Sequence, residues 1–275
     1  NSTAYAFNEF KYHATYTSGI IKKFAPDCTI YSYAVNSLDE AIGAADYLIT
    51  KYNVHVINIS YGQDSYGKYT YYSNRLDYSV YSYRVPIVVA SGNATSSRHA
   101  INYLGMAPNV ITVGAVESTG VIHTLSAYKY WVDASNKYPA SSAYKEGDTV
   151  DDIGTQNKNV VVVNKPDVCA PGVVKLYGIE EKGGTSFAAP HVTGTIVQMM
   201  CRNSGMIGKT EAIKAALMAS AYCSARILDS EYKNEKIVNT NATDMFGAGV
   251  IDSDFCYRVS RNGRQAQYAI LKTTA

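Results

Sequence analysis

The sequence predicts an α/β fold in three layers, α/β/α, around a mostly parallel central sheet. Short apolar segments of strand length alternate along the chain with longer segments in which apolar residues recur at helical spacing. The strand-like segments are apolar at almost every central position, which is typical of strands buried on both faces. Small and polar residues follow several of them directly, at the edge where parallel sheets collect ligand-binding groups.

The composition favours one large domain over residues 1–275. With 47% hydrophobic and 17% charged residues, the chain is long and apolar enough to bury a substantial core. The net charge of +2 includes no long basic run, so neither nucleic acid nor a membrane surface is expected as a partner. No apolar run reaches the roughly 18 to 20 residues of a membrane span. We find neither a linker nor a repeat.

A polar stretch at about residues 128–159 interrupts the alternation of strands and helices. It contains the only tryptophan, Trp131, and the carboxylates of Asp148, Asp151 and Asp152. We predict a surface insertion here. The alternative interpretation is a carboxylate cluster that holds a cation, since hard cations bind to such oxygens.

The cysteines give no strong framework. Five are present, an odd number without CxxC spacing, and they are Cys28, Cys169, Cys201, Cys223 and Cys256. This pattern favours neither a zinc site nor a full set of disulfides. We expect mostly free, buried thiols, and one bridge among the last three cysteines stays open.

Helices are expected where apolar residues recur every three or four positions. A helix over 13–24 should end before the turn at 25–27. Ser37 and Glu40 form the capping box of a second helix. Its inner face would hold Leu38, Ile42, Ala45, Leu48 and Ile49. The spacing of Leu76, Val80 and Tyr83 predicts a third helix, and two more are expected over 188–200 and 210–223.

Strands are expected over 29–35, 54–60, 86–90, 110–116 and 160–163. The turn-rich segment 165–172 is interpreted as a connection that leads through 173–177 to a glycine-rich turn. The second and third of these strands end in Ser60-Tyr-Gly62 and Ser91-Gly-Asn93, which suit backbone contact with a ligand.

The glycine-rich turn carries the candidate nucleophile. Residues 183–194 read Gly-Gly-Thr-Ser-Phe-Ala-Ala-Pro-His-Val-Thr-Gly, with Ser186 just before the predicted helix over 188–200. Glycines give the turn its freedom, and Pro190 is tolerated in the first helical turn. Free N–H groups at the start of a helix favour an anion beside Ser186. The alternative is a tight turn in which the serine merely caps the helix.

A catalytic serine needs a base, and the sequence offers five histidines: His13, His55, His99, His123 and His191. His55 falls in a predicted strand, and His191 lies on another face of the helix that follows Ser186. His123 lies in a turn. His13 opens the predicted helix over 13–24 and is followed by small hydroxylic residues, which suits a base on a packed helix. The residue pattern alone leaves this choice open.

Four further segments carry recognisable motifs in chain order. They are Val56-Ile-Asn-Ile-Ser-Tyr-Gly62, Val88-Val-Ala-Ser-Gly-Asn93, Val110-Ile-Thr-Val-Gly-Ala-Val116 and Lys165-Pro-Asp-Val-Cys-Ala-Pro-Gly172. A fifth motif, at 184–194, matches a serine signature at every constrained position. With these five motifs, the chain from about residue 13 to 252 resembles the subtilisin-like serine peptidases, the subtilase family.

The resemblance implies roles for individual residues. Ser186 would be the nucleophile, His13 its general base, and Asn93 an oxyanion donor beside the Ser186 N–H. Two segments would flank the primary specificity pocket, and the first would pair with a bound peptide. Their residues are Ser60, Tyr61, Gly62, Ala90, Ser91 and Gly92. No cofactor is implied for this chemistry.

The chain departs from the family's pattern around the histidine. Ala14 stands where the family has glycine, and Thr17 and Ser18 replace small apolar residues. The family's catalytic Asp precedes the histidine on the first strand, yet no Asp is found among the residues before His13. Glu9, the only acidic residue there, is a minor alternative. We expect the Asp and the first strand or strands to lie in a segment outside this chain, which would make the peptidase domain N-terminally incomplete.

A calcium site is not expected. Many members of the family hold calcium in a loop that interrupts the helix after the histidine. Here only six residues separate Gly19 from Pro26, which is too few for such a loop. We therefore predict no metal in the site.

The predicted function is that of a serine endopeptidase that cleaves peptide bonds through an acyl-enzyme on Ser186. Without the Asp, the chain by itself would be weakly active or inactive. The alternative is an impaired, pseudopeptidase scaffold that binds a peptide or partner. A nucleotide-binding protein is disfavoured because the turn lacks the lysine and spacing of a phosphate loop.

The expected partners are a peptide or protein substrate and a propeptide or upstream segment of the same precursor. The location stays open, because the family is usually exported whereas free cysteines suit a reducing compartment.

Overall fold

The computed structural model describes residues 2–63, 70–93, 100–128, 165–175, 181–222 and 245–260, with side chains described from residue 12 onward. Of the predicted insertion at 128–159, all but the first residue lies outside these ranges, as does the predicted strand at 160–163.

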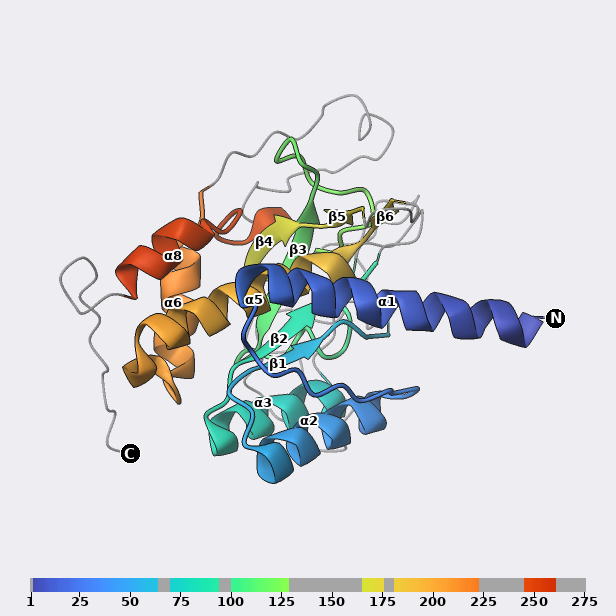
Figure 1. Ribbon diagram of the computed structural model, residues 1–275, viewed down its shortest axis with the longest axis horizontal. Helices are drawn as coiled ribbons and strands as arrows, with labels where there is room; N and C mark the ends of the chain where they lie inside the picture. The colour runs from blue at the N-terminus through green and yellow to red at the C-terminus, as the bar shows by residue number, and fades with distance from the viewer. Residues whose placement is uncertain are drawn as a thin grey trace, which may run out of the picture.

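The central sheet contains four parallel strands in the order β1-β2-β3-β4 (Figure 1). The strands are β1 (Ile57–Ile59), β2 (Ile87–Ala90), β3 (Ile111–Val116) and β4 (Val168–Pro171). Ile57 pairs with Ile87, and the pairing continues in parallel across the other strands. The predicted parallel sheet is confirmed. Parallel strands need crossover connections, and the one from β1 to β2 runs through a helix, Tyr71–Tyr83.

One face of the sheet is covered by α2 (Leu38–Tyr52) and α3 (Tyr71–Tyr83). Ser37 caps α2 by accepting a hydrogen bond from the Glu40 N–H at 3.1 Å, as the capping box predicts. The apolar residues of both helices pack against alternate strand residues. They are Leu38, Ile42, Ala45, Ile49, Leu76 and Val80, packed on Ile57, Ile59, Ile87 and Val89.

The opposite face is covered by α5 (Thr185–Arg202), α6 (Thr210–Ser220) and α8 (Ser253–Val259). A short 3-10 turn, η2 (Ser204–Met206), joins α5 to α6. Val88 and Ala90 of β2 pack on this side, whereas their neighbours Ile87 and Val89 pack on the other. This alternation makes the sheet the middle layer and confirms the three-layer architecture.

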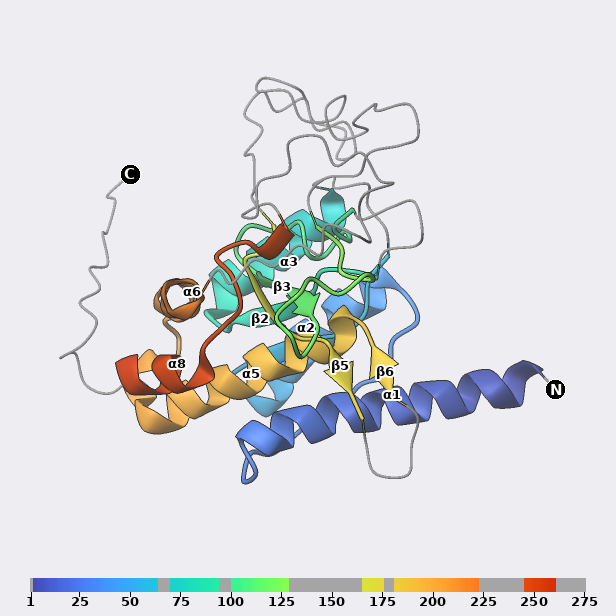
Figure 2. The ribbon, with the colours of Figure 1, turned by 90° about the horizontal axis from the view of Figure 1, so that it is seen from above.

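The first helix, α1 (Ser2–Phe24), lies alongside α5, and its N-terminal end extends beyond the rest of the molecule (Figures 1 and 2). Tyr16 and Ile20 pack on Phe187 of α5. The predicted end at residue 24 is confirmed, but the predicted start at His13 is wrong. Neither glycine nor proline occurs at 2–12 to stop the helix, so His13 lies in its middle.

Two predictions about strands are wrong. Segment 29–35 has no regular secondary structure and pairs with no strand among the described residues. Its alternating tyrosines meet tyrosines of α2 instead: the rings of Tyr31 and Tyr52 stack at 4.4 Å between centroids. The second error is the connection at 165–172, whose residues 168–171 form strand β4. Val168, Cys169 and Ala170 are fully buried there, so the apolar core of this segment outweighs its prolines.

A short antiparallel pair, β5 (Val173–Val174) and β6 (Lys182–Gly183), leads from the sheet into α5. Four cysteines, Cys28, Cys169, Cys201 and Cys256, are free thiols, so a bridge between the last two is not formed. Cys223 lies outside the described residues.

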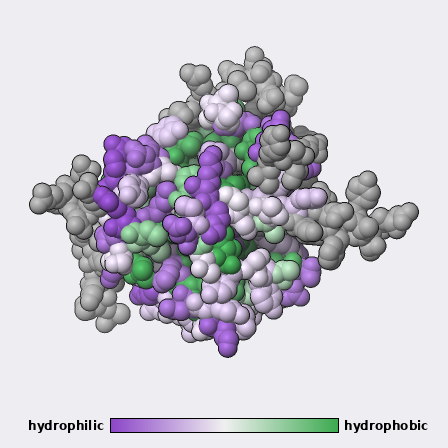
Figure 3. All heavy atoms as spheres, viewed as in Figure 1, coloured by the Kyte–Doolittle hydropathy of each residue, from purple (hydrophilic) through white to green (hydrophobic). Residues whose placement is uncertain are grey.

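The surface seen in Figure 3 mixes hydrophilic and hydrophobic residues, with the apolar ones in small groups. Within the described ranges, no helix combines the length and the apolar character needed to cross a membrane.

Candidate active site

The serine turn lies directly at the start of α5. Gly184 is the residue before the helix and has φ of 149°, a backbone conformation that favours glycine. Its N–H bonds to the Gly172 carbonyl at 2.9 Å, which ties the turn to the end of β4. Ser186 is thus the second residue of α5. The predicted helix start at residue 188 is therefore wrong by one turn, and Ser186 lies inside the first turn, where N–H groups lack helical acceptors.

Asn93 reaches the same turn from the end of β2. Its Oδ1 accepts hydrogen bonds from the Thr185 N–H at 2.9 Å and from the Thr185 hydroxyl at 3.0 Å. The Thr185 hydroxyl also accepts from the Gly92 N–H at 3.2 Å. A Cβ on Gly184 would lie only 3.0 Å from Asn93 Nδ2, so the side-chain amide lies beside the serine turn. The structure brings these two predicted site segments together.

His13 approaches the turn from α1. Its ring packs on that of Phe187, the residue after Ser186, at 5.5 Å between centroids. Burial lowers the pKa of His13 below its ordinary value of 6.5, because the charged form is disfavoured away from water. The imidazole is therefore mostly neutral at pH 7, the form that a general base requires.

His13 contacts the residue after Ser186, and among the described residues it makes no hydrogen bond to Ser186 itself. The Ser186 hydroxyl instead points to the Ser60 carbonyl, with an O···O distance of 3.4 Å. No carboxylate among the described side chains forms an ion pair with His13, and burial is the only cause of its shifted pKa. The side chain of Glu9 lies outside the described set.

The two predicted substrate segments, 60–62 and 90–92, lie next to each other at the ends of β1 and β2. A buried side chain that the sequence did not single out, Asn102, connects them. Its Nδ2 donates to the Ala90 carbonyl at 2.5 Å, and its N–H donates to the Ser91 carbonyl at 2.9 Å. A Cβ on Gly62 would lie 2.6 Å from Asn102 Cγ, so only glycine fits there. The signal was present, since Asn102 is polar between apolar residues.

None of the other described histidines forms a hydrogen bond with the Ser186 hydroxyl, whose partner is Ser60. The His191 ring lies on α5, with Nδ1 2.9 Å from the Phe187 carbonyl. His123 is buried beneath the turn, where a Cβ on Gly183 would collide with its ring, and Nε2 lies 3.5 Å from Glu117 Oε1. His55 is exposed before β1, and His99 is outside the described residues.

No metal centre is found among the described residues, where no three His, Cys, Asp or Glu side chains gather closely enough to hold an ion. Helix α1 runs without interruption through residues 19–24, where a calcium loop would otherwise need to leave it. The three aspartates of the predicted insertion lie outside the described residues.

Comparison with known proteins identifies the family. The model of the subtilase family matches residues 5–249. The chain belongs to the subtilase family. The resemblance predicted from the five motifs is therefore confirmed, and the shared chemistry of the family is that of proteases and hydrolases.

Solved structures agree on the fold. The patellamide maturation protease PatA is 18% identical over 82% of this chain and 69% of its own, with a TM-score of 0.53. The prenylagaramide maturation protease PagA is also 18% identical, over 84% of this chain and 70% of its own, with the same TM-score of 0.53. A search of curated proteins finds no match.

Proposed function

We propose that this subtilase is a serine endopeptidase that forms an acyl-enzyme on Ser186. The observation that carries the proposal is the convergence of Asn93, at the end of β2, on the first turn of α5. Three bonded groups, the Gly92 N–H, the Thr185 side chain and the Asn93 carboxamide, hold this convergence in place. It supports a site in which the Asn93 side-chain amide and the Ser186 N–H act as donors beside one hydroxyl, which is the arrangement that an oxyanion needs.

In the proposed reaction, a peptide lies along residues 60–62 as an added strand, with its scissile carbonyl against Ser186. Neutral His13 takes the Ser186 proton as the hydroxyl oxygen bonds to the carbonyl carbon. The oxygen of the tetrahedral intermediate accepts hydrogen bonds from Asn93 Nδ2 and the Ser186 N–H. His13 then gives its proton to the leaving amine, and a water molecule hydrolyses the ester by the reverse sequence. No cofactor or metal takes part.

Substrate binding must shorten the approach of His13 to Ser186. Catalytic hydrogen bonds are commonly long before substrate is bound and tighten in the complex. We infer that an acidic side chain outside the described set orients His13. Without such a carboxylate, turnover in subtilisin falls by about 3 × 10⁴-fold, so the reaction depends on this orienting group.

The substrate is proposed to be a peptide or protein, which includes a propeptide or another segment of the same precursor. PatA and PagA are maturation proteases, which is consistent with a substrate of this kind. The second candidate is a pseudopeptidase that binds such a peptide without cleaving it. It is favoured by one observation, the direction of the Ser186 hydroxyl toward Ser60 rather than His13.

A fluorophosphonate probe separates the two candidates. The peptidase predicts labelling that maps to Ser186 and is lost in S186A. The pseudopeptidase predicts binding of a peptide without labelling. That outcome would refute the proposed function.

A further inference from the structure

The carbonyl of Ser186 is deprived of its helical hydrogen bond. In an α-helix each carbonyl accepts from the N–H four residues later. For Ser186 that residue is Pro190, which lies inside α5 and has no N–H. Pro190 is buried, so solvent cannot easily supply a donor at its own position. The first turn of α5 therefore needs another group to hold the residue that bears the nucleophile.

The Ser60 hydroxyl supplies that donor from the end of β1. It donates to the Ser186 carbonyl at 2.8 Å across 126 positions of sequence. The hydroxyl itself accepts from Asn58 Nδ2 at 3.0 Å. Asn58 Oδ1 in turn accepts from the Thr193 hydroxyl at 3.0 Å, about two turns beyond Ser186 along α5.

These bonds form a closed connection between β1 and α5. It leaves α5 at Ser186, passes through Ser60 and Asn58, and returns to α5 at Thr193. The second contact between Ser60 and Ser186, from the serine hydroxyl to the Ser60 carbonyl at 3.4 Å, joins the same two residues in the opposite direction. The hydroxyl of Ser60 can therefore neither rotate nor move without disturbing the backbone of Ser186.

We propose that Ser60 is a positioning residue: its hydroxyl replaces the helical bond that Pro190 removes and fixes the backbone of Ser186 for reaction. Asn58 and Thr193 orient that hydroxyl. The inference rests on the proposed role of Ser186 as nucleophile. It assigns the Ser60 side chain a task separate from the substrate pairing expected of its main chain.

The arrangement couples substrate binding to the nucleophile. The Ser60 main chain belongs to the segment on which a peptide is proposed to lie, and its side chain holds the residue that attacks that peptide. Small displacements of a reacting group are costly, because reaction requires atoms held at about 3 to 3.5 Å with aligned orbitals. A rigid link between the two segments keeps that distance constant.

The test is a double-mutant cycle of S60A and P190A in the full chain, read by the rate of fluorophosphonate labelling at saturating probe. S60A is expected to slow labelling roughly tenfold, the equivalent of one hydrogen bond, with the apparent probe affinity little changed. P190A restores an N–H opposite the Ser186 carbonyl, so S60A/P190A should regain most of the loss. S60T, which keeps the hydroxyl, should label nearly as the wild type does.

A matched control is S79A in α3, which removes another hydroxyl that donates to a helical carbonyl, that of Arg75 at 3.1 Å. It should leave the labelling rate unchanged. If S60A slows labelling by the same factor with and without P190A, the proposal is overturned. It is also overturned if S60A labels at the wild-type rate.

Urea denaturation of the same variants gives a readout that does not depend on reactivity. S60A should lower the urea concentration at the midpoint of unfolding, and it should lower it less when P190A is also present. A wild-type chain that never labels would refute the proposed function and the positioning role together. If the changes in midpoint caused by S60A and P190A are then not additive, they still support the replacement of the helical bond by the Ser60 hydroxyl. Additive changes would overturn that replacement too.

Discussion

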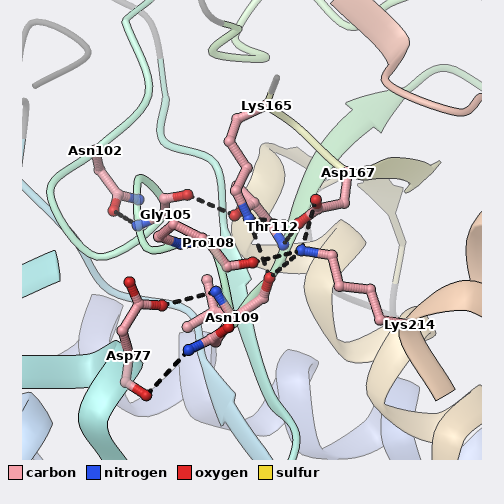
Figure 4. A network of polar contacts seen from close by, with 10 residues as sticks. Asp77, Asn102, Gly105, Pro108, Asn109, Thr112, Lys165, Asp167 and Lys214 are labelled. Carbon is pink, nitrogen blue, oxygen red and sulfur yellow. Dashed lines mark hydrogen bonds and ion pairs between the residues drawn. The ribbon is translucent and has the colours of Figure 1, made fainter. Parts of the chain in front are cut away.

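The two ends of the central sheet are built from different kinds of polar groups. The end where β1, β2 and β4 terminate holds the candidate active site, made of hydroxyls, amides and one neutral imidazole. The end where β3 and β4 begin holds three charged side chains, Lys165, Asp167 and Lys214 (Figure 4). Both ends belong to one four-stranded sheet, and they differ in the chemistry of their polar groups.

The charged end is fully bonded. Asp167 accepts from Lys165 at 2.6 Å, from Lys214 at 2.8 Å and from the Thr112 N–H at 2.8 Å. Both lysines also donate to the Val110 carbonyl. Burial, reinforced by the charge of Lys214, lowers the pKa of Lys165 to about 7.

The comparison indicates that one end of the sheet serves stability and the other serves reactivity. A buried carboxylate that is surrounded by donors is costly to disturb, so the charged end should govern stability. At the other end the Ser186 hydroxyl has only a long contact, and Asn93 is exposed, which leaves both available to a substrate. Variants at one end should therefore change unfolding, and variants at the other should change reactivity.

The largest stability effect is expected from D167N. It leaves two buried or half-buried ammonium groups without their carboxylate, which should cost about 3 to 5 kcal/mol of unfolding free energy. Urea denaturation measures the loss, and labelling per folded molecule should be unchanged. E211Q is the control, because the Glu211 ion pair with Arg84 is exposed and should contribute less than about 1 kcal/mol. Similar losses in both variants would contradict the role given to the charged end.

N93A should have the complementary effect. Loss of the proposed oxyanion donor should slow turnover or labelling by about 10² to 10³-fold, the range known for that donor in subtilisin, with little change in the denaturation midpoint. N109A, which alters an asparagine bonded to Asp77 near the charged end, should label normally (Figure 4). A normal rate in N93A would remove Asn93 from the proposed chemistry.

The lowered pKa of Lys165 predicts that the free energy of unfolding rises with pH. Its amine has a pKa of about 7 in the folded chain and near 10.5 when unfolded. Between these values the unfolded chain binds more protons, so the unfolding free energy should increase as the pH rises through this window. Denaturation at several pH values should show the rise in the wild type and a smaller one in K165M. Parallel curves would show that Lys165 does not titrate in this window.

The smallest expected effect concerns His13. Because burial lowers its pKa below 6.5, the base stays neutral to a lower pH than an exposed histidine would. The rate of labelling should therefore fall on acidification with a midpoint below 6.5. A midpoint above that value would mean that a carboxylate stabilises the imidazolium more strongly than burial opposes it.

The sequence predicted features that depend on local pattern. The buried strands, the cap at Ser37 and the serine turn follow from alternation, capping chemistry and glycine content, all of which neighbours in sequence determine. The family followed from five motifs in order.

Features that depend on distant partners could not be predicted. Segment 29–35 alternates like a strand, but its tyrosines found partners on α2 rather than in the sheet. Asp167 lay in a segment read as a turn, and its two lysines come from positions 165 and 214. The bond from Ser60 to Ser186 spans 126 positions, and only the fold brings these two residues together.

The central claim, an acyl-enzyme on Ser186, is tested most directly by trapping. The chain is incubated with p-nitrophenyl acetate, quenched in acid and mapped by peptide mass spectrometry, with S186A in parallel. The account predicts an acetyl group on the peptide that contains Ser186, forming faster in the wild type than in N93A and absent from S186A. Acetylation confined to lysines and tyrosines, with Ser186 unmodified while peptide cleavage continues, would contradict it.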